Sequence, residues 1–546
     1  MAPRRHCERI ETNGLITSRI FLETWWSRYV SRRKGARNYS ITDDDKMPHL
    51  FLYGPPGTGK STIGKLLGRN LHLPFMDLDR VIAENADMTI PEIMERQGES
   101  AFRDLETSAL MNLSGECVVA LGGGALLRDE NRAFAELHGN VILLMAGLDT
   151  LLKRLSEDTN QRPLLAGDLE TKLTSLLETR REHYNSFPLK LFVDGKTADQ
   201  NAHQTQVMLG RYHLSAMGEY DVVVGQIANL RNVAYGNLIV TDENVAKLHL
   251  EKIKHAIGRD VPSVIIPAGE EHKNLETVSF LWNSFLEHGL DRNSVVIALG
   301  GGVIGDLAGF AASTYMRGID WIAIPTTLLA MVDASIGGKT GFDLPHGKNL
   351  IGSFHPPKLV LADPSLLLTL SDRELRSGMA EVVKHGIIAD SELFEMCNHG
   401  MDWVKNNLEE IVKRSMAVKI KIIEEDPYEK GIRATLNLGH TVGHAVELVS
   451  GFKLKHGEAV AIGMVAEARY AVRVGLAASR VDEAIAGTSS ALGLPIHIPK
   501  ELSREEIIRA MRVDKKKNAQ SIRFALPIEI GKTELVDVDD LDKVLE

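Results

Sequence analysis

The chain contains 546 residues, of which 44% are hydrophobic and 25% are charged, proportions that are typical of globular proteins. This composition excludes a disordered, collagen-like or disulfide-stapled chain, and the length predicts about three or four domains. Acidic residues outnumber basic ones by 73 to 63, which gives a formal net charge of -10 and argues against general binding of nucleic acid.

Cysteines and apolar runs indicate the cellular compartment. Cys7, Cys117 and Cys397 lie far apart and form no CxxC pair, so neither a disulfide framework nor a cysteine zinc site is expected. No apolar run reaches the roughly 18 residues that cross a bilayer, and the first residues lack the order of a signal peptide. We therefore expect a cytoplasmic protein without a membrane partner.

Residues 1–46 differ from the sequence that follows. They are rich in Arg and Lys and show no clean helical or strand period. We interpret them as a poorly structured extension, or as upstream sequence included by a wrong start. An Arg-rich targeting peptide is the weaker interpretation, because acidic residues such as Glu8, Glu11 and Glu23 oppose it.

From 47 to about 210, short β-branched runs alternate with amphipathic stretches, which predicts a parallel sheet with crossover helices. The clearest predicted strands are His49–Tyr53, Cys117–Leu121 and Val141–Met145. The clearest predicted helices are Ser61–Leu71 and Asp149–Glu157. Periodicity weakens at 211–219, where we place a linker.

A second alternating block covers 220–365 and predicts another α/β domain. Its buried strands are expected in the runs DVVVG, NLIVTD, SVIIPAG, SVVIALGGG, WIAIPTT and LVLAD. From 366 to 546 strand signals nearly stop and amphipathic helices dominate, apart from a short strand at Ile522–Leu526. The predicted fold class is α/β, with two sheet domains followed by an all-helical domain.

A phosphate-binding loop follows the first predicted strand. The sequence from Gly54 to Ser61 matches G-x-x-x-x-G-K-[ST] between a strand and a helix. Backbone N–H groups of such a loop face an anion, Lys60 would reach the β- and γ-phosphates, and the Ser61 hydroxyl would hold Mg²⁺. The residues expected to bind ATP are Gly54, Gly57, Thr58, Gly59, Lys60, Ser61 and Thr62.

The loop alone does not identify a substrate, because the sequence GPPGTGKST is equally typical of oligomeric AAA-type ATPases. Those proteins need an apolar strand that ends in Asp-Glu to hold Mg²⁺. Here the corresponding strand is followed by Gly122, Gly123 and Gly124, which would let a small substrate approach the backbone closely. The sequence therefore favours a small-molecule kinase.

Polar residues further along sharpen this prediction. Asp77 and Asp79 flank one residue at a strand end, so that one carboxylate would order Mg²⁺ waters and the other would accept a proton from a substrate hydroxyl. Arg103 lies in FRDLE on a helix, and Arg162 lies in RPLL, a segment suited to a lid. With the phosphate loop and the glycine triplet, these motifs resemble shikimate kinase over 47–210.

The resemblance implies which residues bind shikimate and ATP. Arg162 would close over the ATP phosphates, and Asp79 would lie beside the attacked hydroxyl. Arginines suit the carboxylate of shikimate, although Arg181 adjoins Arg180 and the usual Pro before Tyr184 is missing. The shikimate-binding residues would be Asp79, Arg103, Gly122, Gly123, Gly124 and Arg180.

A glycine loop and a histidine cluster mark a second site. The sequence from Gly300 to Asp306 follows a predicted strand and opens a helix, as in loops that seat a pyrophosphate, but it departs from GxGxxG. His440 and His444 share one helix face, which on spacing alone favours them as zinc ligands together with a Glu such as Glu381. Nearby cations suit a doubly anionic substrate such as a phosphorylated sugar acid, and they are Arg317, Lys339, Lys348, Lys384, Lys419 and Arg433.

The run from GGGVIGD to HGKNLIG, followed by MAEVVKHG and NLGHTVGHAVE, strongly resembles 3-dehydroquinate synthase from about 220 onward. The resemblance implies zinc, or cobalt, on Glu381, His440 and His456, which overrides the prediction from spacing, and it implies His444 near the substrate phosphate. It implies NAD at Asp242, Asn244, Glu270, Lys273, Gly301, Gly302, Asp306, Thr326, Thr327, Asp333, Lys339 and Lys348. Substrate would meet Arg317, Lys384, Lys419, Arg433, Asn437 and Asn349, and also either Lys515 or Lys516.

We therefore predict a fusion of a P-loop kinase domain with a Rossmann-like NAD domain and a helical metal-binding domain. The first half would phosphorylate shikimate, and the second would convert 3-deoxy-D-arabino-heptulosonate 7-phosphate to 3-dehydroquinate and phosphate. These reactions are not consecutive in the shikimate pathway, and a homodimer through the second half is expected.

Two alternatives stay open at this point. One is a gluconate-type or nucleotide kinase fused to a glycerol-dehydrogenase-like oxidoreductase. The other is a P-loop binding or remodelling module that carries an inactive synthase.

Overall fold

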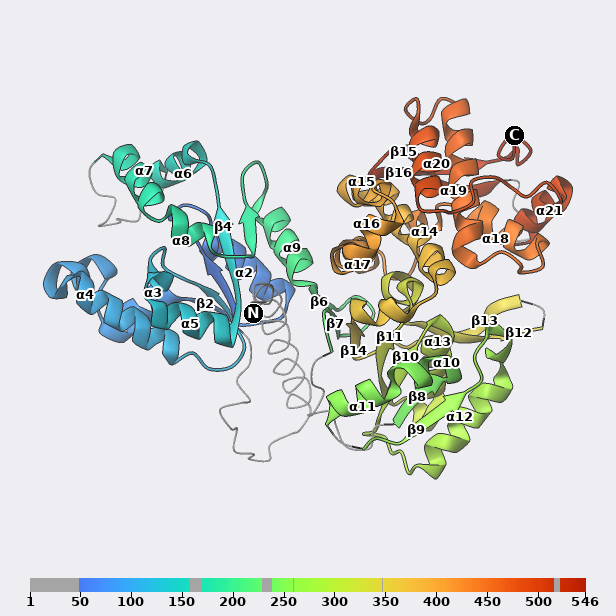
Figure 1. Cartoon of the computed structure of the whole chain (residues 1–546), viewed down its shortest axis with the longest axis horizontal. Helices are drawn as coiled ribbons and strands as arrows, with labels where there is room; N and C mark the ends of the chain where they lie inside the picture. The colour runs from blue at the N-terminus through green and yellow to red at the C-terminus, as the bar shows by residue number, and fades with distance from the viewer. Residues whose placement is uncertain (1–48, 158–167, 228–237, 259, 346, 515–520) are drawn as a thin grey trace, which may run out of the picture. The chain divides into compact units, whose positions relative to one another are not determined.

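The computed structural model describes residues 49–157, 168–227, 238–258, 260–345, 347–514 and 521–546 (Figure 1). These residues form two compact units. The first consists of the described residues up to His213 together with the short segments 226–227 and 255–258, and the second consists of the other described residues from Leu214 onward. Residues 1–46, Arg162, Lys515 and Lys516, on which predictions were made, lie outside the described residues.

The first unit is built on a parallel sheet in the order β2-β3-β1-β4-β5. Strand β1 is buried along its whole length, because it lies between β3 and β4 and both its faces are covered by helices. The strands are β1 (His49–Tyr53), β2 (Phe75–Asp77), β3 (Val118–Ala120), β4 (Gly139–Met145) and β5 (Lys190–Phe192). The helices are α2 (Lys60–Asn70), α3 (Leu78–Ala86), α4 (Ile90–Met111), η2 (Ala125–Leu127), α5 (Asp129–His138), α6 (Leu148–Ser156), α7 (Leu169–Thr179), α8 (Arg181–Asn185) and α9 (Ala198–Leu209).

His49 begins β1 inside this core. Its ring is 4% exposed, and its Nδ1 lies 3.2 Å from the sulfur of Cys117. Burial lowers the pKa of His49 from 6.5 to about 4; the nearby carboxylate of Glu116 opposes this shift to a smaller extent, and His138 adds slightly to it. The folded state therefore keeps this imidazole neutral at a pH at which the unfolded chain would protonate it.

We expect this histidine to make the first unit acid-labile. Between pH 6.5 and 4 the unfolded state binds a proton that the folded state does not, so stability falls as the pH falls through this window. A His49→Gln variant lacks this penalty, and between pH 7 and pH 5 it should lose about 2 kcal/mol less unfolding free energy than the unmodified chain. Scanning calorimetry of both full chains measures the difference, and equal losses would contradict the expectation.

The second unit contains a parallel sheet in which β7, β14, β11, β10, β8 and β9 follow one another in space. Their bounds are β7 (Tyr220–Val224), β8 (Leu238–Asp242), β9 (Ser263–Ile266), β10 (Val295–Gly300), β11 (Asp320–Pro325) and β14 (Leu359–Ala362), and β6 (Arg211–Leu214) lies at the junction of the two units. All six predicted runs thus form strands. The accompanying helical elements are α10 (Glu243–Val245), η4 (Ala246–Leu250), α11 (Glu251–Ile257), η5 (Glu270–His272), α12 (Leu275–Glu287), α13 (Gly302–Thr314), η6 (Tyr315–Arg317), η7 (Ala330–Ala334) and η8 (Pro364–Thr369).

A hairpin that the sequence analysis did not predict lies between β11 and β14 in the chain. Strands β12 (Lys339–Leu344) and β13 (Gly347–Phe354) pair antiparallel, and most of β13 is exposed. Three glycines and two lysines interrupt the alternation of apolar and polar residues that identifies a strand, which is why the pattern was missed.

The remaining elements are helical except at the end of the chain. They are α14 (Asp372–Ala389), α15 (Ser391–Asn398), α16 (Met401–Asn406), α17 (Leu408–Glu425), η9 (Ile432–Asn437), α18 (His440–Val449), α19 (His456–Arg473), α20 (Val481–Ala491) and α21 (Arg504–Asp514). The short strand predicted at Ile522–Leu526 is confirmed within β15 (Ile522–Glu529). This strand pairs with β16 (Lys532–Val538) in a second hairpin, and β16 was not predicted.

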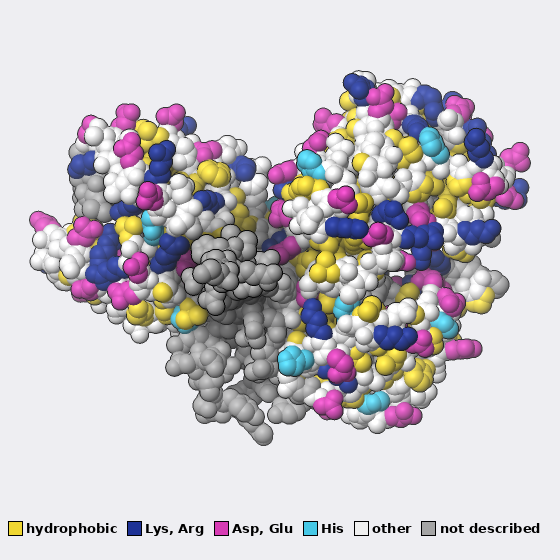
Figure 2. Space-filling model, in the orientation of Figure 1, with side chains coloured by type: hydrophobic (Ala, Val, Ile, Leu, Met, Phe, Trp, Pro, Cys, Tyr) yellow, Lys and Arg dark blue, Asp and Glu magenta, His cyan; other side chains and the backbone are white. Residues whose placement is uncertain are grey.

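Figure 2 shows acidic and basic side chains interspersed over the described parts of both units, so no single sign of charge dominates this face. Among the described residues, no helix is both long enough and apolar enough to span a membrane.

Candidate active sites

The phosphate loop joins β1 to α2 in a geometry that requires glycine. Gly54 has a φ of 137° and Gly59 a φ of 88°, and a Cβ on Gly54 would lie 2.2 Å from the carbonyl oxygen of Leu144. Lys60 Nζ donates to the carbonyl oxygens of Gly54 and Pro55, at 2.8 and 2.9 Å. The lysine therefore lies across the loop, as its predicted phosphate role requires.

The hydroxyls of the loop are held by nearby groups. Ser61 Oγ donates to Asp77 Oδ2 at 2.6 Å, which places the predicted Mg²⁺ hydroxyl beside a carboxylate at the end of β2. Thr58 is buried, and Thr62 follows Ser61 on α2. Arg154 from α6 donates to the carbonyl of Gly57 at 3.3 Å, a contact that no sequence motif indicated.

Two carboxylates and an arginine surround the glycine triplet after β3. A Cβ on Gly122 would lie 2.7 Å from Glu106 Oε1 and 3.1 Å from Asp79 Oδ1, and one on Gly124 would lie 2.8 Å from Arg103 Nη2. The structure thus brings together the predicted residues Asp79, Arg103 and Gly122–Gly124. Arg180 joins them, because its Nη1 donates to the carbonyl of Gly123 at 2.6 Å.

Glu106 is the last residue of the FRDLE motif, but the sequence analysis gave it no role. Its side chain is fully buried and accepts from Arg103 Nη1 at 2.8 Å. Burial raises the pKa of Glu106, whereas the guanidinium of Arg103 opposes this shift. Nη2 of the same guanidinium donates to Glu99 Oε1 at 3.1 Å, so two glutamates on α4 fix the direction of the Arg103 side chain.

In the second unit, the residues predicted for the dinucleotide gather at the carboxyl ends of neighbouring parallel strands. Asp242 ends β8, the glycine loop follows β10, and Thr326 and Thr327 follow β11. Asp242 accepts from the backbone N–H groups of Asn244 and Val245 at 2.9 and 3.0 Å. This edge of an open α/β sheet is where ligands bind.

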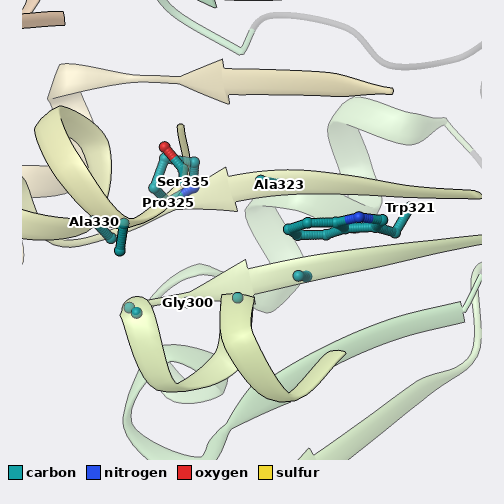
Figure 3. Close-up of a pocket in the computed structure, with 11 residues that line it drawn as sticks. Gly300, Trp321, Ala323, Pro325, Ala330 and Ser335 are labelled. Carbon is teal, nitrogen blue, oxygen red and sulfur yellow. The ribbon is translucent and has the colours of Figure 1, made fainter. Parts of the chain in front are cut away.

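A pocket lined by small residues and by the ring of Trp321 lies beside the glycine loop (Figure 3). Its lining comes from the ends of β10 and β11, the start of α13 and helix η7, and includes Gly300, Pro325, Ala330 and Ser335. A Cβ on Gly301 would lie 3.3 Å from the side chain of Thr327, so the backbone packs closely here. Small residues leave the loop N–H groups accessible to a flat or anionic group.

Ionic contacts connect several further residues of the predicted cofactor set. Lys273 Nζ lies 2.6 Å from both Asp306 Oδ2 and Asn349 Oδ1, and Lys348 Nζ lies 3.9 Å from Glu270 Oε1. Burial raises the pKa of Asp306 to about 6 against the opposing charge of Lys273. Lys273 therefore joins Asp306 to Asn349, and Lys348 lies next to Glu270, as two separate polar groups.

The predicted metal ligands converge from three helices. Oε1 of Glu381 on α14 lies 3.4 Å from Nε2 of His440 on α18 and 3.4 Å from Nε2 of His456 on α19. Donor atoms about 2.1 Å from a tetrahedral zinc ion lie roughly 3.4 Å apart, so this set fits such an ion. The pair His440 and His444, which spacing favoured, is not the grouped set, because the His444 ring is exposed and lies 5.1 Å from that of His440.

A close crossing of α18 and α19 creates this convergence. A Cβ on Gly463 would lie 2.0 Å from the carbonyl oxygen of Gly439, and one on Gly443 would lie 3.0 Å from that of Ala459. The buried carboxylate of Glu467 on α19 accepts from the backbone N–H groups of Gly439 and Val442, at 2.6 and 3.4 Å. It thereby stabilises the amino end of the helix on which His440 is the first residue.

Cations predicted for the substrate lie around the metal set. Lys384 forms an ion pair with Glu381, and Lys419 forms one with Asp333, all within a buried region. Burial lowers the pKa of Lys419 although the carboxylate of Asp333 opposes this shift.

The other residues predicted to bind cofactor or substrate differ in their contacts. Glu429 accepts from Lys339 Nζ and from Asn437 Nδ2, each at 3.0 Å, and the buried Arg433 donates to a carbonyl of the same loop. Arg317 is exposed in η6, and no hydrogen bond or ion pair joins it to another described residue.

Glu447 was also missed, although it contacts both halves of this site. Its Oε1 lies 3.0 Å from Lys348 Nζ, and its Oε2 lies 3.6 Å from His456 Nδ1. Burial raises the pKa of Glu447, but His456 and Lys348 outweigh this effect and lower the pKa to about 2. The carboxylate is therefore charged at neutral pH and orients the Lys348 ammonium group and the His456 ring.

Comparison with known proteins bears on both units. A family model of shikimate kinase matches residues 56–209, and models of the 3-dehydroquinate synthase N-terminal and C-terminal domains match 263–377 and 378–517. A 3-dehydroquinate synthase of Nostoc punctiforme is 45% identical over 333 residues, which is 59% of this chain and 91% of that protein. One of Thermoanaerobacter is 43% identical and is covered to 93%.

The solved structure of a 2-epi-5-epi-valiolone synthase from Streptomyces hygroscopicus, with NAD⁺ and Zn²⁺ bound, is also similar. It is 31% identical with a TM-score of 0.55, over 60% of this chain and 94% of that one.

Proposed function

Because the chain belongs to the 3-dehydroquinate synthase family and carries a shikimate kinase domain ahead of that part, we propose that the clusters described above are its two active sites. The protein is a bifunctional enzyme of the shikimate pathway. It phosphorylates shikimate with ATP and Mg²⁺, and it converts 3-deoxy-D-arabino-heptulosonate 7-phosphate to 3-dehydroquinate and phosphate with NAD and a divalent metal. The observation that carries the assignment of the second site is the convergence of Glu381, His440 and His456.

In the kinase half, the chain's own residues orient the substrates and take up a proton. Lys60 would exchange its carbonyl partners for phosphate oxygens, and Ser61 with Asp77 would hold Mg²⁺ and its waters. Arg103 and Arg180 would grip the shikimate carboxylate. Asp79 would accept the proton of the attacked hydroxyl, because its carboxylate lies against the glycine loop on which the ring would rest.

In the synthase half, Glu381, His440 and His456 would hold the zinc or cobalt ion, which when bound polarises a substrate oxygen. Lys384 and Lys419 supply positive charge in a buried region, and with Arg433 they would bind the carboxylate and phosphate groups of the substrate. Asn437 and Asn349 would orient its hydroxyls, and His444 would face its phosphate. The edge at Asp242, Gly301, Gly302 and Thr326 would hold NAD, with its pyrophosphate on the amino end of α13.

Paired assays on the full chain test this function. ADP formation should depend on shikimate and not on gluconate or nucleoside monophosphates, and phosphate should be released from the heptulosonate phosphate without net NADH formation. ADP formation without shikimate dependence would reject the kinase assignment. Net NADH from a polyol without phosphate release would reject the synthase assignment.

A homodimer through the synthase half is part of the proposal. The hairpin β12–β13 exposes four large apolar side chains, whereas such side chains are usually buried. They are Leu344 at 37%, Ile351 at 41%, Phe354 at 57% and Leu350 at 61%. We propose that a second copy of this chain covers them.

Light scattering on the purified protein should then give twice the mass of the chain. The variant Leu350→Glu/Phe354→Glu should give the monomer mass, because two charges would be buried at the interface. The exposed Leu286→Glu on α12 serves as the control and should stay dimeric. A monomeric unmodified chain would contradict the proposal.

We also propose a cytoplasmic location with small-molecule substrates as the partners. Cys117 and Cys397 are both buried free thiols, as expected in a reducing compartment. Cell fractionation followed by shikimate-dependent ADP formation in the soluble fraction tests this location.

A further inference from the structure

One carbonyl oxygen in the kinase unit is contacted by three side-chain donors. Gly123 O accepts from Arg180 Nη1 at 2.6 Å, from the Tyr184 hydroxyl at 3.0 Å and from the Tyr53 hydroxyl at 3.3 Å. The Tyr53 hydroxyl also lies 3.1 Å from His183 Nε2. A carbonyl oxygen has two lone pairs, so three donors are one more than it has lone pairs to accept. Together they fix the orientation of the Gly123 peptide group.

The two tyrosines come from different parts of the fold. Tyr53 is the last residue of β1, directly before the phosphate loop, and Tyr184 lies on α8. Both are buried, at 0% and 1% exposure, and their rings meet edge to face at 5.7 Å. Burial raises the pKa of both phenols, so each hydroxyl keeps its proton and acts as a donor.

The position of Gly123 matters because its neighbours are the proposed shikimate contacts. Gly124 lies against Arg103, and Gly122 lies against Asp79. Arg180 donates one of its N–H groups to the carbonyl oxygen of Gly123 itself. The other guanidinium N–H groups remain directed by this contact and are left for the substrate carboxylate.

We propose that Tyr53 and Tyr184 are positioning residues for the acid substrate, acting through the Gly123 carbonyl on the glycine loop and on Arg180. Tyr53 in addition links this loop to β1, the strand that precedes the phosphate loop. The end of β1 therefore positions both the proposed shikimate site and the proposed ATP-phosphate site. The inference rests on the proposed shikimate kinase function.

The full chain with Tyr53→Phe or Tyr184→Phe tests the inference by steady-state kinetics with each substrate varied in turn. Loss of one hydrogen bond should raise the KM for shikimate by roughly three- to ten-fold, with the KM for ATP and the kcat changed by less than about two-fold. Calorimetric titration with shikimate alone should show the same loss of affinity. In the double variant the effect should be smaller than the product of the two, because both hydroxyls bind one acceptor.

Thr205→Val is the matched control. Its buried hydroxyl donates to the carbonyl of Asn201 at 2.8 Å in the same unit, so it removes a comparable bond away from the glycine loop. An unchanged KM for shikimate in both tyrosine variants would overturn the inference, as would equal changes in the tyrosine variants and the control. An unmodified chain that forms ADP without shikimate would instead overturn the proposed function, and the inference with it.

Discussion

Glu381→Gln is expected to abolish phosphate release from the heptulosonate phosphate while shikimate-dependent ADP formation is unchanged. The substitution replaces a charged ligand by a neutral amide in a fully buried position. The other two predicted ligands, imidazoles within 3.4 Å, are uncharged when they bind a metal, so the variant set would carry no negative charge to balance the cation. A metal that polarises a substrate oxygen contributes several kcal/mol to the barrier, so the loss in kcat should be about 10³-fold or more. Phosphate release and ADP formation, assayed in the same preparation, measure the two activities.

Glu374→Gln provides a matched control for this prediction, because it makes the same change on the same helix at a side chain that is 40% exposed and paired with Lys455. It should leave both activities intact. Chelation should reproduce the effect of Glu381→Gln, and Zn²⁺ or Co²⁺ should restore phosphate release in the unmodified chain only. Retention of bound metal and of activity in Glu381→Gln would disprove the assigned ligand.

The second large effect is expected from Asp79→Asn in the kinase half. Asparagine keeps the size of the side chain but does not accept the proton of the shikimate hydroxyl, so kcat should fall by roughly 10²- to 10⁴-fold. The KM for ATP should stay close to that of the unmodified chain, since Lys60 and the phosphate loop are untouched. Coupled ADP assays at saturating ATP measure the loss, and synthase activity in the same sample reports on folding.

Asp87→Asn is the control for this substitution. Asp87 ends the same helix α3 in the left-handed region, with a φ of 49°, a conformation that asparagine also adopts readily. It should retain full kinase activity. If Asp79→Asn kept more than about a tenth of the unmodified kcat, proton acceptance by this carboxylate would be refuted.

The sequence predicted those parts of the fold that are recorded in local patterns. Central parallel strands such as β1 and β10 are buried on both faces, and they appear in the sequence as continuous apolar runs between turn residues. The exposed strand β13 has no buried face to enforce such a run, and its pairing with β12 depends on a partner that local periodicity does not reveal. This is why both hairpins of the second unit were missed or only half predicted.

The same distinction applies to the sites. The phosphate loop and the glycine triplet are contiguous motifs, and their residues lie where the motifs imply. Spacing on one helix favoured His444, whereas His456 reaches the metal set only because glycines let α19 cross α18 closely. Glu106 and Glu447 end the FRDLE and NLGHTVGHAVE motifs, but their roles depend on contacts to Arg103 and Lys348 that the motifs alone do not reveal.

Glu447 has a consequence for the order in which the synthase acquires its ligands. One carboxylate contacts Lys348, proposed for the dinucleotide, and His456, proposed for the metal. Because Glu447 contacts a residue of each site, binding of NAD should change the affinity for the metal ion. By thermodynamic linkage, binding of the metal ion should then change the affinity for NAD by the same factor. Titrating the apoprotein with NAD in the presence and absence of zinc would then reveal cooperative loading rather than two separate equilibria.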